Sequence, residues 1–83
     1  MIDWQIAVRT QYGIEPTAEA IRTACEGWGW VCEFVIDPVR GVRICSITVP
    51  LADGDVERLG VGATLDEAAC RALVELPHHP VLD

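Results

Sequence analysis

The segment from Gly60 to Leu76 constrains the fold most, because it predicts where a strand ends and a helix begins. It reads Gly-Val-Gly-Ala-Thr-Leu-Asp-Glu-Ala-Ala-Cys-Arg-Ala-Leu-Val-Glu-Leu. Thr64 and Glu67 have the spacing of a capping box, in which each side chain satisfies a backbone amide at a helix start. Apolar residues then recur three to four positions apart, which is typical of a helix that packs on one side, and Pro77 predicts its end.

Upstream, residues 2–12 alternate between apolar and polar positions, which predicts a strand. The helical spacing of residues 17–27, with Thr17 as a possible cap and Gly27 as a stop, predicts a short helix. Residues 28–36 and 42–51 are rich in apolar and β-branched residues and flank the turn residues 37–41, so they predict a hairpin. A second turn at 52–55, with its Asp-Gly pair, predicts a further short strand at 56–61.

The predicted order of elements is therefore β-α-β-β-β-α. Each predicted helix has one apolar face, and the hairpin offers apolar surface to receive it. This pattern predicts an α+β fold: a two-layer sandwich with an antiparallel sheet of three to four strands and two helices on one face. We expect a single domain over residues 1–76 and a C-terminal tail over residues 77–83, since 83 residues leave no room for a second core.

The charge of the chain limits the classes of partner. Thirteen acidic residues face six basic ones, none of them lysine, for a net charge of −7. This balance opposes direct binding to nucleic-acid phosphates and favours a protein partner with a basic surface. No apolar stretch approaches the ~20 residues needed to cross a bilayer, and Asp3 stands where a signal peptide would carry positive charge, so we expect a cytoplasmic protein.

Residues with chemical potential do not form a recognisable catalytic, cofactor or metal site in the sequence. The four cysteines, Cys25, Cys32, Cys45 and Cys70, lack the paired spacing of structural zinc sites, and packing as small hydrophobes is the expected role. A metal site assembled by tertiary contact remains an alternative. So does a cysteine-dependent enzyme that uses Cys70 or Cys45 with His78 or His79, although a tail is a poor place to hold a catalytic histidine.

Two further motifs have plain structural explanations. Asp53, Asp55 and Glu57 resemble the start of a calcium loop, but the glycine is misplaced and Thr64 stands at the twelfth position, so a solvated acidic hairpin tip is expected. Gly60 and Gly62 lack the third glycine of a dinucleotide fingerprint. We therefore expect no enzyme, no cofactor and no metal.

The tryptophans Trp4, Trp28 and Trp30 all fall on apolar faces, which favours the core. Trp4 is the one expected to be partly exposed, if the first strand lies at an edge of the sheet. Tryptophan is also enriched at binding hot spots, so Trp4 is a candidate contact.

Residues 17–76 resemble a group of small phage-encoded α-β-β-β-α sandwich proteins, in which a helix leads into a strand that starts with Gly-Trp. The matching residues are Ala20-Ile21, Gly27-Trp28 and Ala69-Cys70-Arg71-Ala72-Leu73. The topology is distantly similar to the double-stranded RNA-binding domain, whose last helix would start at Thr64-Leu65-Asp66-Glu67-Ala68. Here acids replace the basic residues that grip RNA, so that resemblance implies architecture and not RNA binding.

The phage resemblance implies a function in evading host defence, since anti-CRISPR proteins are similar in size and charge. The expected function is a non-enzymatic, acidic inhibitor that occupies the basic surface of a host nucleic-acid-handling complex, such as a CRISPR–Cas effector, in the bacterial cytoplasm. The expected protein-binding residues are Asp53, Asp55, Glu57, Asp66, Glu67 and Trp4. The alternative is a structural or regulatory phage module that forms a homodimer by pairing its exposed first strand with that of a second copy.

Overall fold

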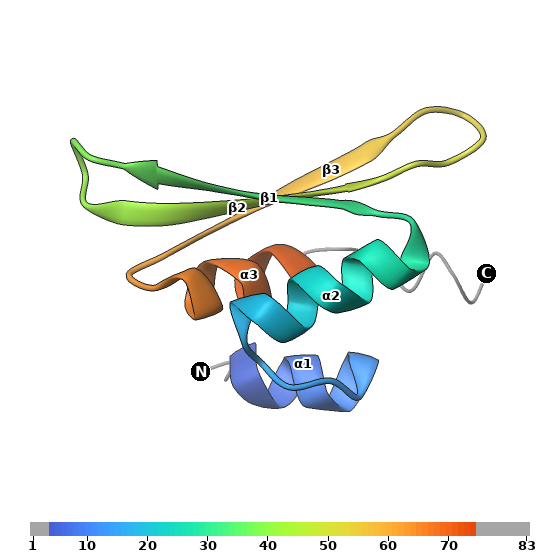
Figure 1. Cartoon of the computed structure of the whole chain (residues 1–83), viewed down its shortest axis with the longest axis horizontal. Helices are drawn as coiled ribbons and strands as arrows, with labels where there is room; N and C mark the ends of the chain where they lie inside the picture. The colour runs from blue at the N-terminus through green and yellow to red at the C-terminus, as the bar shows by residue number, and fades with distance from the viewer. Residues whose placement is uncertain (1–3, 75–83) are drawn as a thin grey trace.

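A computed structural model of the chain describes residues 4–74, which form three helices and three strands (Figure 1). In chain order the elements are α1 (Trp4–Tyr12), α2 (Ala18–Trp28), β1 (Val31–Asp37), β2 (Val42–Val49), β3 (Val56–Gly62) and α3 (Leu65–Val74). The strands form one antiparallel sheet in the order β1-β2-β3. The α+β prediction is confirmed, with three strands in the part of the chain that the structure describes.

The helices all lie on one side of the sheet. Figure 1 shows α2 and α3 next to each other beneath the strands, and α1 on the side of these two helices that faces away from the sheet. The sheet with α2 and α3 makes the predicted two layers. Helix α1 adds a further layer behind them.

The first segment corrects the predicted order, because residues 4–12 form a helix and not a strand. Trp4, Val8 and Tyr12 are spaced four residues apart, so they share a face in a helix as well as in a strand. In the structure Val8 is fully buried and Ile6, which a strand would have placed beside it, is 61% exposed. Tyr12 donates a hydrogen bond from its hydroxyl to the carbonyl of Leu73 at 3.3 Å, which ties α1 to α3. Tertiary packing therefore selects the helical period.

Helix α2 begins where predicted and ends slightly later. The Thr17 hydroxyl accepts a hydrogen bond from the Ala20 amide, as an N-cap does. Gly27 stays within the helix, and the C-cap is Gly29, whose φ of 80° is in the left-handed region. The helix therefore extends through Trp28, and β1 starts at Val31, three residues later than predicted.

Both predicted turns are confirmed. Between β1 and β2, the Asp37 carboxylate accepts hydrogen bonds from the amides of Val39 and Arg40, which fixes a tight reversal. Between β2 and β3, the amide of Gly54 donates to the carbonyl of Leu51 at 3.2 Å. Gly54 has a φ of 126°, a conformation that other residues rarely adopt.

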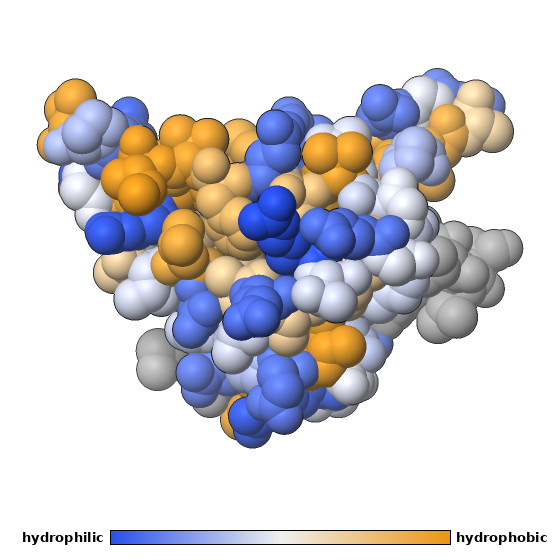
Figure 2. Space-filling model, viewed as in Figure 1, coloured by the Kyte–Doolittle hydropathy of each residue, from blue (hydrophilic) through white to orange (hydrophobic). Residues whose placement is uncertain are grey.

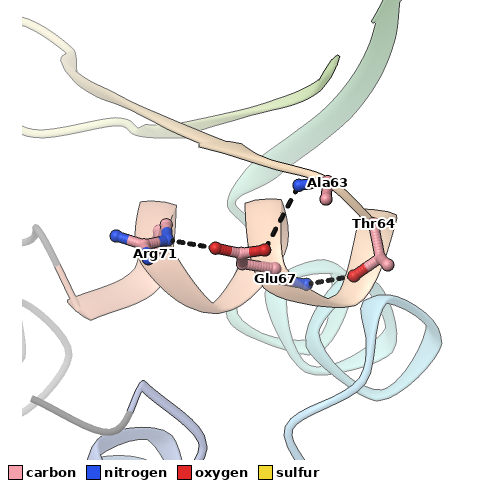
Figure 3. A network of polar contacts seen from close by, with 4 residues as sticks. All are labelled: Ala63, Thr64, Glu67 and Arg71. Atoms are coloured by element: carbon pink, nitrogen blue, oxygen red, sulfur yellow. Dashed lines mark hydrogen bonds and ion pairs between the residues drawn. The ribbon is translucent and has the colours of Figure 1, made fainter. Parts of the chain in front are cut away.

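Helix α3 is capped and packed as its sequence predicts. The Glu67 amide donates to the Thr64 hydroxyl, and the Glu67 carboxylate accepts from the Ala63 amide (Figure 3). The fully buried Ala68 and Ala72 lie against Gly60 of β3, where a side chain at position 60 would collide with the backbone of the helix. Gly60 thus allows the close approach of helix and sheet.

The core lies between the sheet and the helices. Its buried residues are Val8, Ile21, Cys25, Trp30, Cys45, Ile47, Val49, Ala68, Ala69, Cys70, Ala72 and Leu73. Tyr12 and Trp28 pack against the core and form an aromatic cluster with Trp30, with ring centroids 5.7 Å apart for Tyr12–Trp28 and 4.6 Å apart for Trp28–Trp30. The aromatic residues therefore contribute mainly to packing.

Candidate protein-binding surface

The first three predicted acids lie together at one end of the sheet. Asp53 and Asp55 are exposed in the loop between β2 and β3, and Glu57 follows in β3. Neither aspartate forms an ion pair with another residue between 4 and 74, and Glu57 accepts a hydrogen bond from the Ser46 hydroxyl at 2.9 Å. We call the segment 51–57 the acidic hairpin. Its carboxylates are available to a partner.

Asp66 and Glu67 lie at the other end of β3, because they start the helix that follows it. The seven residues of β3 separate Asp53 and Asp55 from Asp66 and Glu67 by about 20 Å, at roughly 3.3 Å per residue. The structure therefore does not unite the five acids in one patch. The length of β3 keeps Asp53 and Asp55 apart from Asp66 and Glu67.

Asp66 and Glu67 are also engaged within the molecule. Asp66 accepts a hydrogen bond from the Ala18 amide at 2.8 Å, which joins the starts of α3 and α2. Glu67 bridges the Ala63 amide and the Arg71 guanidinium, with 2.9 Å to Arg71 Nε (Figure 3). The hydrogen bond from Ala63, followed by that from Arg71, lowers the pKa of Glu67 below its ordinary value. Both acids therefore have structural roles within the molecule.

Trp4 is in α1, partly buried and packed against the core. The reason for expecting it at a sheet edge was wrong, because its segment is helical. The homodimer route through an exposed first strand is wrong for the same reason. The edge strands of the described sheet are β1 and β3.

The surface of the sheet that faces away from the helices was not predicted from the sequence. Alternate residues of each strand point to this side, and we call them the outer face: Val31, Glu33, Val35, Asp37, Val42, Ile44, Ser46, Thr48, Glu57, Leu59 and Val61. None of the helices between residues 4 and 74 covers it (Figure 1). Val35, Leu59 and Val61 are 56%, 57% and 48% exposed.

The register arranges the outer face in rows. Val35, Ile44 and Val61 are direct cross-strand partners and form an apolar row across all three strands. The next row is Glu33, Ser46 and Leu59, and the one after it Val31, Thr48 and Glu57. From the row of Val35 toward the acidic hairpin, the face thus changes from apolar to acidic, and on the other side of that row Asp37 pairs with Val42 at the β1–β2 turn. Figure 2 shows apolar surface gathered at the β1–β2 end of the molecule.

The cysteines meet on the inner side of the sheet. Cys32 Sγ and Cys45 Sγ are 3.7 Å apart, and Cys25 from α2 completes the group. Cys32 shares hydrogen bonds with the thiols of Cys25 and Cys45, and these lower the pKa of Cys32 and raise the pKa of the other two. Burial raises the pKa of Cys70 to about 12. Cys45 and Cys70, the candidates for a catalytic thiol, are thus fully buried and hard to ionise.

The other chemical alternatives gain no support from the described part of the chain. Residues 4–74 contain no group of three or more histidine, cysteine or acidic side chains arranged to hold a metal. His78, His79 and the predicted tail 77–83 lie outside the described residues. An open depression of about 580 Å³ beside α2 is lined mainly by small and apolar residues, together with Glu15 and Glu19. Within residues 4–74, no helix has the length and apolar character needed to span a membrane.

No family model, no curated protein and no solved structure matches this chain.

Proposed function

We propose that this protein is a non-enzymatic inhibitor that binds a basic surface on a nucleic-acid-handling protein, as an anti-CRISPR protein binds a CRISPR–Cas effector in the bacterial cytoplasm. The observation that carries the proposal is the distribution of charge. The chain has a net charge of −7, and the carboxylates of Asp53 and Asp55 form no ion pair within residues 4–74.

The arginines are used in a contrasting way. Four of the six form ion pairs within the molecule: Arg9–Glu15, Arg22–Glu26, Arg40–Asp37 and Arg71–Glu67. Each pair neutralises an acid on the helices, on their connections or at the β1–β2 turn. Arg58 is the basic residue nearest the acidic hairpin, and its guanidinium donates to the Glu57 carbonyl. The acidic hairpin thus keeps its negative charge.

Charge of this kind favours encounter with a basic groove. Opposite charges on two proteins accelerate association and fix the orientation of the complex, especially at low salt. A groove that binds DNA or RNA phosphates carries such positive charge. Carboxylates at a protruding hairpin tip can enter it where phosphates would lie, which would block the nucleic acid without any catalytic step.

The test is a plaque assay in bacteria that carry an active CRISPR–Cas system and express the protein. A targeted phage should form plaques again when the protein is present. The double substitution Asp53→Lys and Asp55→Lys should abolish this recovery of plaques. The matched control, Glu19→Lys with Glu26→Lys, makes the same change in net charge on α2 and should retain it.

Two outcomes would contradict the proposal. One is that the protein fails to restore plaques in every one of several CRISPR–Cas types. The other is that the hairpin variant, shown to be folded by circular dichroism, restores plaques as well as the unaltered chain. In the first case a structural or regulatory module becomes the better explanation, and light scattering would test whether it forms a dimer through a surface other than its first segment.

A further inference from the structure

The outer face of the sheet carries more apolar surface than a solvent-facing side requires. In an antiparallel sheet with one face on the core, the other face usually carries polar residues. Here Val35, Ile44 and Val61 stand side by side across the three strands, and Leu59 lies two residues from Val61 on the same side. An exposed apolar cluster with polar neighbours is a common feature of interaction sites.

The geometry of the face limits what can cover it. Three strands about 4.8 Å apart give a width of about 14 Å, and seven residues of about 3.3 Å give a length of about 23 Å. The flat area is thus on the order of 300 Å², well below the ~800 Å² that each partner buries in a stable interface. The outer face alone is too small to hold two copies of the chain together.

Charge also disfavours a second copy. Ser46 pairs with Glu33 on β1, and it donates a hydrogen bond to Glu57, which lies in the neighbouring row on β3, so two carboxylates lie next to Ser46 on this face. In a face-to-face pair, these carboxylates would approach those of a second chain that also has a net charge of −7. Like charges in a desolvated contact are costly. A partner with basic groups would relieve the same cost.

We propose that the outer face binds an amphipathic, basic helix of the partner protein. A helix with its side chains is about 10–12 Å across, which matches a three-stranded face of about 14 Å. Its apolar side lies on the row Val35, Ile44 and Val61, and its flanking Lys or Arg residues pair with Glu33 and Glu57. The acidic hairpin continues the negative charge beyond the end of the helix.

This inference rests on the proposed protein-binding function and names the surface and the partner chemistry that serve it. The outer face supplies the desolvated apolar part of the contact, and the acidic hairpin extends the contact and supplies the steering charge. The two can fail separately. The plaque assay tests the function, and a binding measurement in solution tests the face.

The experiment is an NMR titration of the isotopically labelled full chain with a synthetic 15-residue Leu/Lys peptide that forms an amphipathic helix. A peptide of the same composition in scrambled order is the control for charge without a segregated apolar side. We expect the amphipathic peptide to shift the methyl signals of Val35, Ile44 and Val61, and to bind at least tenfold more tightly than the scrambled one.

Matched variants locate the site. Val35→Thr with Val61→Thr keeps two β-branched residues in the strands and removes apolar surface, so the affinity for the peptide should fall at least tenfold. Ile6→Thr makes a similar change on α1, which α2 and α3 separate from the sheet. This variant should bind the peptide with an affinity within twofold of the unaltered chain.

Three results would overturn the inference. The first is that the methyl shifts map to the helices or to the acidic hairpin alone. The second is that the scrambled peptide binds as tightly as the amphipathic one. The third is that sedimentation shows a dimer in which a second copy already protects the outer-face methyls. If the peptide binds the face and the plaque assay is negative, the face is right and the proposed function is wrong. The reverse pair of results retains the function and rejects the face.

Discussion

The two faces of the sheet are built from the same three strands and have opposite properties. The inner face presents Cys45, Ile47 and Val49 from β2, all buried under the helices, and Gly60 and Gly62 from β3. The outer face presents the alternating residues of the same strands, and no described helix covers it. The difference shows that apolar character in these strands serves two purposes: internal packing on one side and an available contact surface on the other.

Substitution of neighbouring residues of β3 should show the largest difference in stability between the two faces. A Cβ at Gly60 would stand against the backbone of α3, at the Ala68 carbonyl oxygen and the Ala72 nitrogen. Backbone atoms cannot rotate away, so Gly60→Val should destabilise the protein by about 3 kcal/mol or more. Val61→Ala, one residue along on the outer face, should cost less than about 1 kcal/mol. Urea unfolding measures both, and equal losses would contradict the assignment of faces.

Strand β2 offers the same test by removal of volume. Ile47→Ala deletes three carbons from a fully buried side chain, which should cost about 3 kcal/mol. Ile44→Ala removes the same atoms from the half-buried outer face and should cost about 1 kcal/mol. The difference between the two unfolding free energies is the quantity to measure. A larger loss at Ile44 would mean that the outer face is buried in solution.

The pH dependence of stability also distinguishes the two faces, because all the cysteine thiols lie on the inner side of the sheet. Burial raises the pKa of Cys70 from its ordinary 9.0 to about 12, so the unfolded chain loses this proton first as the pH rises. The stability due to the neutral thiol is therefore complete below pH 9 and declines between pH 9 and 12. From this residue alone we expect a loss of about 1 kcal/mol between pH 8 and 10.

Urea midpoints measured across this range should fall more steeply for the unaltered chain than for Cys70→Ala. The comparison uses slopes, so the cavity that the substitution leaves does not affect it. Identical slopes would show that Cys70 is no harder to ionise in the folded protein than in the unfolded one.

The smallest expected effect concerns the start of α3, the helix that covers β3. Thr64→Ala removes the acceptor of the Glu67 amide and should lower stability by about 1 kcal/mol (Figure 3). Thr10→Ala, at an exposed position within α1, serves as the control and should cause no loss. A Thr64 variant as stable as the control would mean that the cap contributes nothing.

Local chemistry predicted the parts of the fold that local interactions determine. The Thr64–Glu67 pair, the Thr17 cap and the two turns depend on residues a few positions apart, so they could be read from the sequence. The first segment could not. Trp4, Val8 and Tyr12 fit both a strand and a helix, and the packing of α1 on α3 decides between them.

The candidate surface was predictable only in part, for a similar reason. Asp53 and Asp55 sit on a turn that the sequence identifies, and they are exposed as expected. Their separation from Asp66 and Glu67 depends on the direction of β3. The apolar row of Val35, Ile44 and Val61 depends on strand register, which composition does not reveal, and on all three helices covering the same side of the sheet.

The most direct test of the central claim is the solvent exposure of isoleucine methyls in β2, measured by paramagnetic relaxation with a soluble gadolinium chelate in dilute protein. Ile44 and Ile47 are three residues apart and lie on opposite faces. The account predicts strong relaxation enhancement at Ile44 and almost none at Ile47. Equal protection of both methyls would contradict it, because the outer face would then be covered in the free protein and closed to a partner.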